Sequence, residues 1–245
     1  MAAIIYGCGT GRSGTHSLCQ LLNQQPHTLV FHELDPDRMA WEGAESTVLD
    51  LLNFYQRSLE TRTPVRELKA YPRGRRELES FQGPLNRIGE LAFYYLPYVP
   101  LLFKKDPRIQ VVCLERDEEA TVQSYLKKTY TVRKQKILGP ITFRRTIDRN
   151  HWVIHQGKIW TRDPRWDSCY PKYDCSTKEE ALHRYWQDYH RQSLALEQEY
   201  PGRFKVFPLE ALNTEEGQRE ILDWIGIPTA EHRYRVGIQT NRTPA

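Results

Sequence analysis

The chain has 245 residues, of which 39% are hydrophobic and 27% are charged, and its formal net charge at neutral pH is +4. This size is that of one large α/β domain and is long enough to bury a core, and the balance is ordinary for a soluble globular protein. No apolar run approaches the roughly 18 residues of a membrane span, and residues 2–6 lead into a glycine-rich turn without the features of a signal peptide. A soluble, cytoplasmic protein with no membrane partner is therefore expected.

Apolar periodicity predicts strands that alternate with helices along the chain. Strands are expected at 3–8, 28–31, 109–114 and 204–207. Helices are expected at 15–24, 44–57, 86–103 and 117–128. A capping box of Ser176 and Glu179 predicts the start of another helix, and Asn213 is expected to cap a last helix that ends at Ile225. This alternation predicts an α/β fold over 1–245, a single domain with a central parallel sheet flanked by helices.

The segment 129–175 has mixed aromatic residues, Gly and Pro, and only weak periodicity. It predicts an irregular insert, or a lid over an acceptor site, because it is longer than an ordinary connection. Residues 127–165 hold eleven Lys or Arg against two Asp, a local charge of +9. That charge favours an anionic ligand or partner. A solvated basic surface explains the same pattern equally well.

The first predicted strand runs into the sequence G-C-G-T-G-R-S-G-T-H-S, followed by a predicted helix. A tight glycine turn lets the backbone approach a phosphate, and the free N–H groups and dipole of the helix start favour negative charge. The candidate anion-binding residues are Gly11, Arg12, Ser13, Gly14, Thr15, His16 and Ser17.

Two classes of nucleotide compete for this loop. An ATP-type P-loop requires Lys after its last glycine, and here Thr15 follows Gly14, so kinase or ATPase chemistry is disfavoured. The loop also contains GxGxxG at 9–14, with Glu33 about twenty residues on, at the end of the second strand. An NAD(P)-dependent, Rossmann-type oxidoreductase is therefore an alternative interpretation.

The loop also resembles that of PAPS-dependent sulfotransferases (PAPS is 3'-phosphoadenosine-5'-phosphosulfate), in which Lys or Arg precedes Ser-Gly-Thr after the first strand. Here Arg12-Ser13-Gly14-Thr15 fits. The family's second element is a strand that ends in Arg, with Ser eight positions later, and Arg116 and Ser124 match it. The resemblance covers about 1–126 and 176–228. It implies a P-loop-like sulfotransferase fold, with Arg116 and Ser124 holding the 3'-phosphate.

The same resemblance implies an enzyme that transfers a sulfuryl group from PAPS to a hydroxyl or amine and releases PAP. No metal is expected, because a sulfonate carries less charge than a phosphoryl group. Many members have Lys where this chain has Arg12, and an Arg-Lys-Gly stretch near the C-terminus that is missing here. Asn241-Arg242-Thr243 is a candidate substitute.

The predicted catalytic residues are Arg12, Glu33 and His32. Arg12 would stabilise the leaving 5'-phosphate, and a base must take the proton of the acceptor. His32 and Glu33 end the second strand, at the sheet edge where open α/β sheets bind ligands. The resemblance favours Glu33 as the base.

The acceptor and the oligomeric state stay open. A small molecule or carbohydrate is expected as acceptor, an anionic one being favoured by the basic insert, with no nucleic-acid partner. A non-catalytic adapter that binds nucleic acid or an acidic partner through the insert is a further alternative, and it would show strong salt dependence and no nucleotide pocket.

Overall fold

The computed structural model describes residues 2–36, 45–127, 129–133, 144–148, 173 and 175–237. For 129–133 and 144–148 it describes the course of the backbone.

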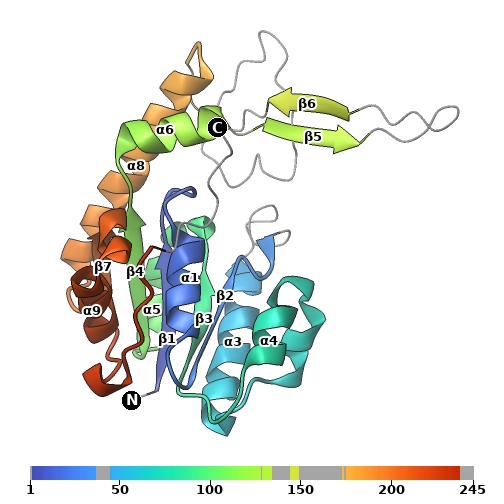
Figure 1. Cartoon of the computed structure of the whole chain (residues 1–245), viewed down its shortest axis with the longest axis vertical. Helices are drawn as coiled ribbons and strands as arrows, with labels where there is room; N and C mark the ends of the chain where they lie inside the picture. Colours follow the sequence, from blue (N-terminus) through green and yellow to red (C-terminus); the bar gives the residue numbers. More distant parts are fainter. Residues whose placement is uncertain are drawn as a thin grey trace, which may run out of the picture.

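The core of the fold is a five-stranded parallel sheet in the order β2-β3-β1-β4-β7. The strands are β1 (Ala3–Cys8), β2 (Thr28–His32), β3 (Arg87–Leu91), β4 (Ile109–Glu115) and β7 (Phe204–Pro208). Because all five run the same way, their carboxyl ends meet at one edge of the sheet (Figure 1). The predicted α/β class with a central parallel sheet is confirmed.

Helices cover both faces of this sheet (Figure 1). The helices are α1 (Thr15–Asn23), α3 (Glu45–Thr61), α4 (Arg75–Ser80), α5 (Val99–Lys105), α6 (Glu118–Leu126), α8 (Lys178–Glu199) and α9 (Glu215–Trp224). Short 3-10 turns are η1 (Arg66–Ala70), η2 (Pro72–Gly74), η3 (Phe93–Tyr98), η4 (Leu209–Asn213) and η5 (Thr229–Glu231). None of the helices described is long and apolar enough to cross a membrane.

Strand β1 shows why the sheet is apolar on both sides. Its residues alternate between two core clusters. Ile4 and Tyr6 belong to the cluster that includes side chains of α3, α5 and α8, whereas Ile5 belongs to the cluster of α1 and α9. A parallel strand buried on both faces reads as a continuous apolar run, and this is the pattern that predicted β1 correctly.

The predicted helix at 86–103 is wrong in its first part, because this segment opens with β3, whereas its later part is helical in η3 and α5. Strand β3 lies between β1 and β2, and an added Cβ at Gly89 would lie 1.7 Å from the carbonyl oxygen of Ile5. Only glycine permits this close approach of two backbones. Two charged residues of the strand, Arg87 and Glu90, are buried, and their polarity hides the strand from an apolar pattern.

Two predicted helix caps are each displaced by one residue. The hydroxyl of Thr177, not Ser176, accepts a hydrogen bond from the Glu180 amide at the start of α8. At the start of α9, the hydroxyl of Thr214, not the side chain of Asn213, accepts a hydrogen bond from the Gly217 amide. Both threonines have an extended backbone, as a cap residue requires.

Part of the predicted insert forms regular structure. Strands β5 (Thr129–Arg133) and β6 (Arg144–Asp148) pair antiparallel in a separate two-stranded sheet (Figure 1). The predicted irregular character is therefore wrong for these ten residues. Residues 134–143, 149–172 and 174 of the insert lie outside the described residues, and so do the predicted lid as a whole and the candidate stretch 241–243.

Candidate functional site

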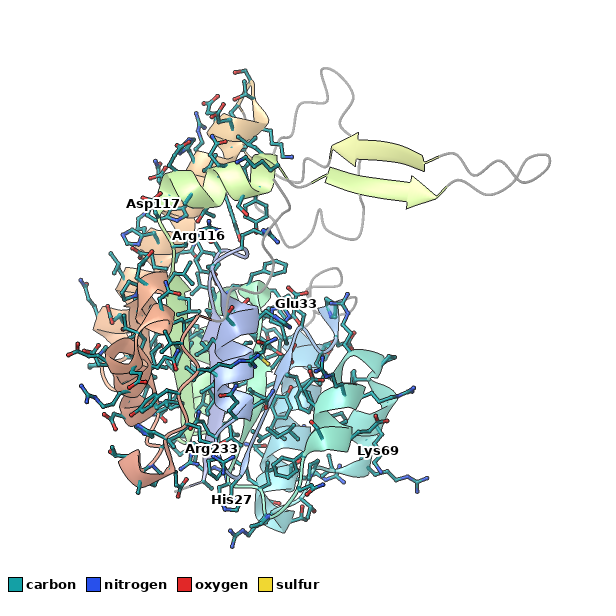
Figure 2. The ribbon with its side chains drawn as sticks, in the orientation of Figure 1. His27, Glu33, Lys69, Arg116, Asp117 and Arg233 are labelled. Atoms are coloured by element: carbon teal, nitrogen blue, oxygen red, sulfur yellow. The ribbon has the colours of Figure 1, made fainter. Side chains whose placement is uncertain are left out.

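The candidate residues gather at the carboxyl edge of the sheet. Strand β1 lies between β3 and β4, whereas β2, the next strand along the chain, lies beyond β3. Open α/β sheets bind ligands outside their carboxyl ends, where the strand order changes direction. Figure 2 shows Glu33 and Arg116 at this end of the molecule and His27 at the opposite end.

The loop that follows β1 has the backbone of an anion cradle. Gly9, Gly11 and Gly14 have φ angles of 153°, 75° and 91°, and Arg12 has φ 60°. An added Cβ at Gly11 would lie 2.2 Å from the hydroxyl of Tyr125, so both the conformation and the space require glycine there.

Helix α1 begins directly after this loop. Its first turn holds no acidic residue, and its N-cap, Gly14, provides no side-chain cap. The positive end of the helix dipole therefore faces the loop, and no acidic side chain in the first turn of the helix neutralises it. Helices that bind phosphate have this arrangement.

Three tyrosines from α6 and α8 fix the loop backbone. The hydroxyl of Tyr189 accepts from the Gly9 amide at 2.8 Å and donates to the Phe93 carbonyl at 3.1 Å. The hydroxyls of Tyr125 and Tyr185 both donate to the carbonyl of Thr10, at 2.6 and 3.0 Å. Such contacts orient the residues that touch a ligand. None of these three tyrosines was predicted as a site residue, and the i, i+4 spacing of Tyr185 and Tyr189 was the available signal.

Arg12, Arg116 and Ser124 form one cluster at this loop. The Arg12 Nε donates to the Ser124 hydroxyl at 2.9 Å, and Arg116 donates to the Arg12 carbonyl at 3.0 Å. Trp186 in turn donates its indole N–H to the Arg116 carbonyl at 2.8 Å. The resemblance assigned Arg12 to the 5'-phosphate and the Arg116–Ser124 pair to the 3'-phosphate. The structure shows that Arg12 contacts both members of this pair.

Two polar atoms of the loop region are buried without a hydrogen-bond partner among the described residues. They are the hydroxyl of Ser13, which is fully buried, and Nδ1 of His16. An unsatisfied buried donor or acceptor costs about 1–3 kcal/mol. Unpaired polar atoms beside an uncapped helix start favour a polar ligand at this place.

His32 lies on the α1 side of the sheet. Its Nε2 is 3.1 Å from the Thr15 hydroxyl, and its ring meets the His16 ring edge-on, with centroids 5.1 Å apart. This agrees with the strand alternation, which places His32 on the same face as Val30.

Glu33 follows β2 in a left-handed backbone conformation, with φ 50°. Its carboxylate accepts a hydrogen bond from Arg73 at 3.2 Å, and this pair also forms a partly exposed ion pair. Sequence reasoning missed Arg73, although the basic run R-G-R-R at 73–76 was the available signal.

Within the described residues, no group of three or more His, Cys, Asp or Glu side chains is placed to hold a metal ion.

The surroundings of His32 keep its ring neutral. Burial lowers the pKa of His32 from 6.5 to about 4, and the neighbouring His16 and Arg73 act in the same direction. A positive charge on the ring would lose hydration and be repelled by the Arg73 guanidinium.

The first testable consequence concerns stability in acid. The neutral ring of His32 contributes stability that is fully present above pH 6.5, because the unfolded chain takes up a proton below that pH and the folded chain does not until about pH 4. As the pH falls between these values, the free energy of unfolding of the wild type should decrease by up to about 3 kcal/mol more than that of His32→Gln. Each protein is compared with its own free energy of unfolding at pH 7. Urea unfolding at pH 7 and 4.5 measures this difference. An NMR titration that places the His32 pKa near 6.5 would refute it.

No protein-family model matches this chain, and no curated protein matches its sequence. Among solved structures, the chain is similar to a sulfotransferase from Alicyclobacillus acidocaldarius. The TM-score is 0.50 at 13% sequence identity, and the match covers 98% of this chain and 87% of the other. At this identity the likeness concerns the fold, and the chain therefore has a sulfotransferase-like α/β fold.

Proposed function

We propose that this protein is a sulfotransferase that takes the sulfuryl group of PAPS and passes it to a hydroxyl or amine, releasing PAP. The observation that carries the proposal is the cluster of Arg12, Arg116 and Ser124 beside the uncapped start of α1. Two guanidinium groups, a hydroxyl and a set of backbone N–H groups form a site for a ligand with more than one phosphate-like group.

In this proposal, two groups of residues would hold PAPS. The loop from Gly11 to Gly14 and the start of α1 would hold the 5'-phosphosulfate, and the buried, unpartnered hydroxyl of Ser13 is a donor that such a ligand could satisfy. Arg116, directly after β4, and Ser124 of α6 would hold the 3'-phosphate. The bond from Arg12 to Ser124 connects the two groups.

The proposed chemistry requires positioning and charge stabilisation. The acceptor oxygen or nitrogen bonds to sulfur while the bond from sulfur to the 5'-phosphate oxygen breaks, and the electron pair leaves with PAP. Glu33 takes the proton of the acceptor, and Arg12 with the loop N–H groups stabilises the charge that develops on the leaving phosphate. The buried ring of His32 would help to orient this edge through Thr15.

The strand order disfavours the nicotinamide alternative. In the Rossmann arrangement, strand 2 is the direct neighbour of strand 1, which brings its terminal acidic residue to the ribose. Here β3 lies between β1 and β2, so the strand order is not that of the Rossmann arrangement. That alternative also gives Arg116 and Ser124 no role.

A thermal-shift screen with PAP, PAPS, ATP, NADH and NADPH tests the proposal. At a hundred times its Kd, a ligand that binds the folded state alone stabilises it by about 2.7 kcal/mol. For a chain of this size we expect PAP to raise Tm by about 5–10 °C, and the other nucleotides apart from PAPS to do less. A larger shift with NADH or NADPH than with PAP would favour an oxidoreductase. No shift with any nucleotide, together with salt-sensitive binding of polyanions, would favour an adapter.

A further inference from the structure

Glu90 is a carboxylate in the middle of the sheet. It lies on β3, opposite Tyr6 of β1 and Phe31 of β2, and it is fully buried. Among the described residues, no Arg, Lys or His forms an ion pair with it. Removing a carboxylate from water is costly, and an apolar side chain would fill the same place at lower cost. The position therefore calls for an explanation other than packing.

Four donors surround the two oxygens of this carboxylate. Oε1 accepts from the Leu34 amide and from the Tyr94 hydroxyl, both at 2.7 Å. Oε2 accepts from the hydroxyls of Tyr95 at 2.6 Å and Tyr55 at 3.0 Å. An ionised carboxylate offers about four acceptor sites, so this set matches its full capacity. A protonated acid would have one acceptor site fewer than the donors require.

Burial and hydrogen bonding act on Glu90 in opposite directions. Burial is the larger effect and raises the pKa of Glu90 above its ordinary value, while the bonds from Tyr95, Tyr94, the Leu34 amide and Tyr55 partly offset that rise. These donors are the means by which a buried carboxylate can keep its charge without a cation.

The bond to Leu34 connects Glu90 with the candidate base. Leu34 follows Glu33, whose left-handed backbone is unfavourable for a residue with a Cβ. The amides on both sides of the Glu33 Cα are held by consecutive residues of β3. The Glu33 amide donates to the Leu91 carbonyl at 3.2 Å, and the Leu34 amide donates to the Glu90 carboxylate.

We propose that Glu90 is a positioning residue, whose carboxylate holds the Leu34 amide and thereby fixes the backbone of Glu33 at the reactive edge of the sheet. Tyr55, Tyr94 and Tyr95 hold the carboxylate in the orientation that this task requires. The inference rests on the proposed function, because it takes Glu33 as the general base.

The test uses Glu90→Gln, which preserves the shape but offers fewer acceptor sites, and Tyr94→Phe, which removes the donor that shares Oε1 with Leu34. The control is Tyr6→Phe. The Tyr6 ring packs against Tyr95 with centroids 4.7 Å apart, and its buried hydroxyl has no hydrogen-bond partner among the described residues.

Hydrogen exchange, PAP affinity and kcat are measured for each variant. In Glu90→Gln we expect exchange of the Leu34 amide to accelerate by about tenfold to a hundredfold relative to the Val111 amide of β4, the effect of weakening one hydrogen bond to a charged acceptor. We expect kcat to fall while PAP affinity stays within about twofold, since the hydrogen-bond partners that the described residues provide to Glu90 lie outside the loop of the nucleotide site. Tyr94→Phe should show the same pattern more weakly, and Tyr6→Phe should match the wild type.

The outcomes separate this inference from the proposed function. Unchanged exchange at Leu34, or an equal acceleration at Leu34 and Val111, overturns the positioning role. Local acceleration with an unchanged kcat also overturns it, because Glu33 would then act without this support. If Glu90→Gln does not fold, Tyr94→Phe decides by the same criteria. If the wild type transfers no sulfuryl group, the proposed function fails. The exchange pattern of the variants then still decides whether Glu90 fixes this edge.

Discussion

Glu33→Gln should lower kcat by about a hundredfold to ten-thousandfold, the usual contribution of a general base. Glutamine keeps the shape of the side chain and can still accept the hydrogen bond from Arg73, but it cannot take a proton at neutral pH. PAP affinity should change little, because the proposed phosphate contacts come from Arg12, Arg116 and Ser124 and not from the Glu33 carboxylate. Steady-state kinetics with PAPS and an acceptor, and calorimetry with PAP, give the two readouts.

Two variants distinguish this role from its competitors. Arg73→Ala breaks the ion pair but leaves the carboxylate, so it should reduce kcat far less than Glu33→Gln if the carboxylate acts as a base. An equal loss in both variants would assign Glu33 the structural task of ordering Arg73. His32→Ala should also do less, because burial makes the protonated ring unfavourable. If Glu33→Gln keeps near wild-type activity while His32→Ala is inactive, the base is the histidine.

Local chemistry made part of the fold predictable. Strands β1 and β4 are buried on both faces and are therefore largely continuous apolar runs. The glycines of the loop after β1 predicted its tight turn, and they have positive φ angles in the structure. Strand β3 could not be recognised in this way. Its buried Arg87 and Glu90 depend on partners far away in the sequence, which include Glu231 and Tyr55. A pattern of apolar residues carries no information about such partners.

The same limit applies to the candidate site. The motif spacing indicated Arg116 and Ser124. Their contact with Arg12 arises because β4 lies beside β1, and local periodicity does not predict the order of strands in a sheet. The hydroxyl of Tyr189 reaches Gly9 across 180 positions of sequence. Glu90 was assigned to a helix, so its connection to the β2 edge could not be foreseen.

Arg116→Ala should weaken PAP binding by about tenfold to a hundredfold, and Ser124→Ala by about twofold to tenfold. A charge-assisted bidentate contact contributes about 1.5–3 kcal/mol, against about 0.5–1.5 kcal/mol for a neutral hydroxyl bond. Arg116→Lys should lie between wild type and Arg116→Ala, because lysine keeps the charge and loses the planar fork. Arg219→Ala is the charge-matched control, since Arg219 is an exposed residue of α9 with one long ion pair to Glu216.

A second ligand shows whether Arg116 contacts the 3'-phosphate or only supports the loop. Adenosine 5'-phosphosulfate lacks the 3'-phosphate, so the wild type should bind it more weakly than PAPS, and Arg116→Ala should bind it as well as the wild type does. Arg116 also donates to the Arg12 carbonyl, and a loop that had lost this support would bind both ligands more weakly. An equal loss for the two ligands therefore assigns Arg116 to the loop. A loss confined to ligands with a 3'-phosphate assigns it to that phosphate, because the only difference between the two ligands is the group that the guanidinium is proposed to hold.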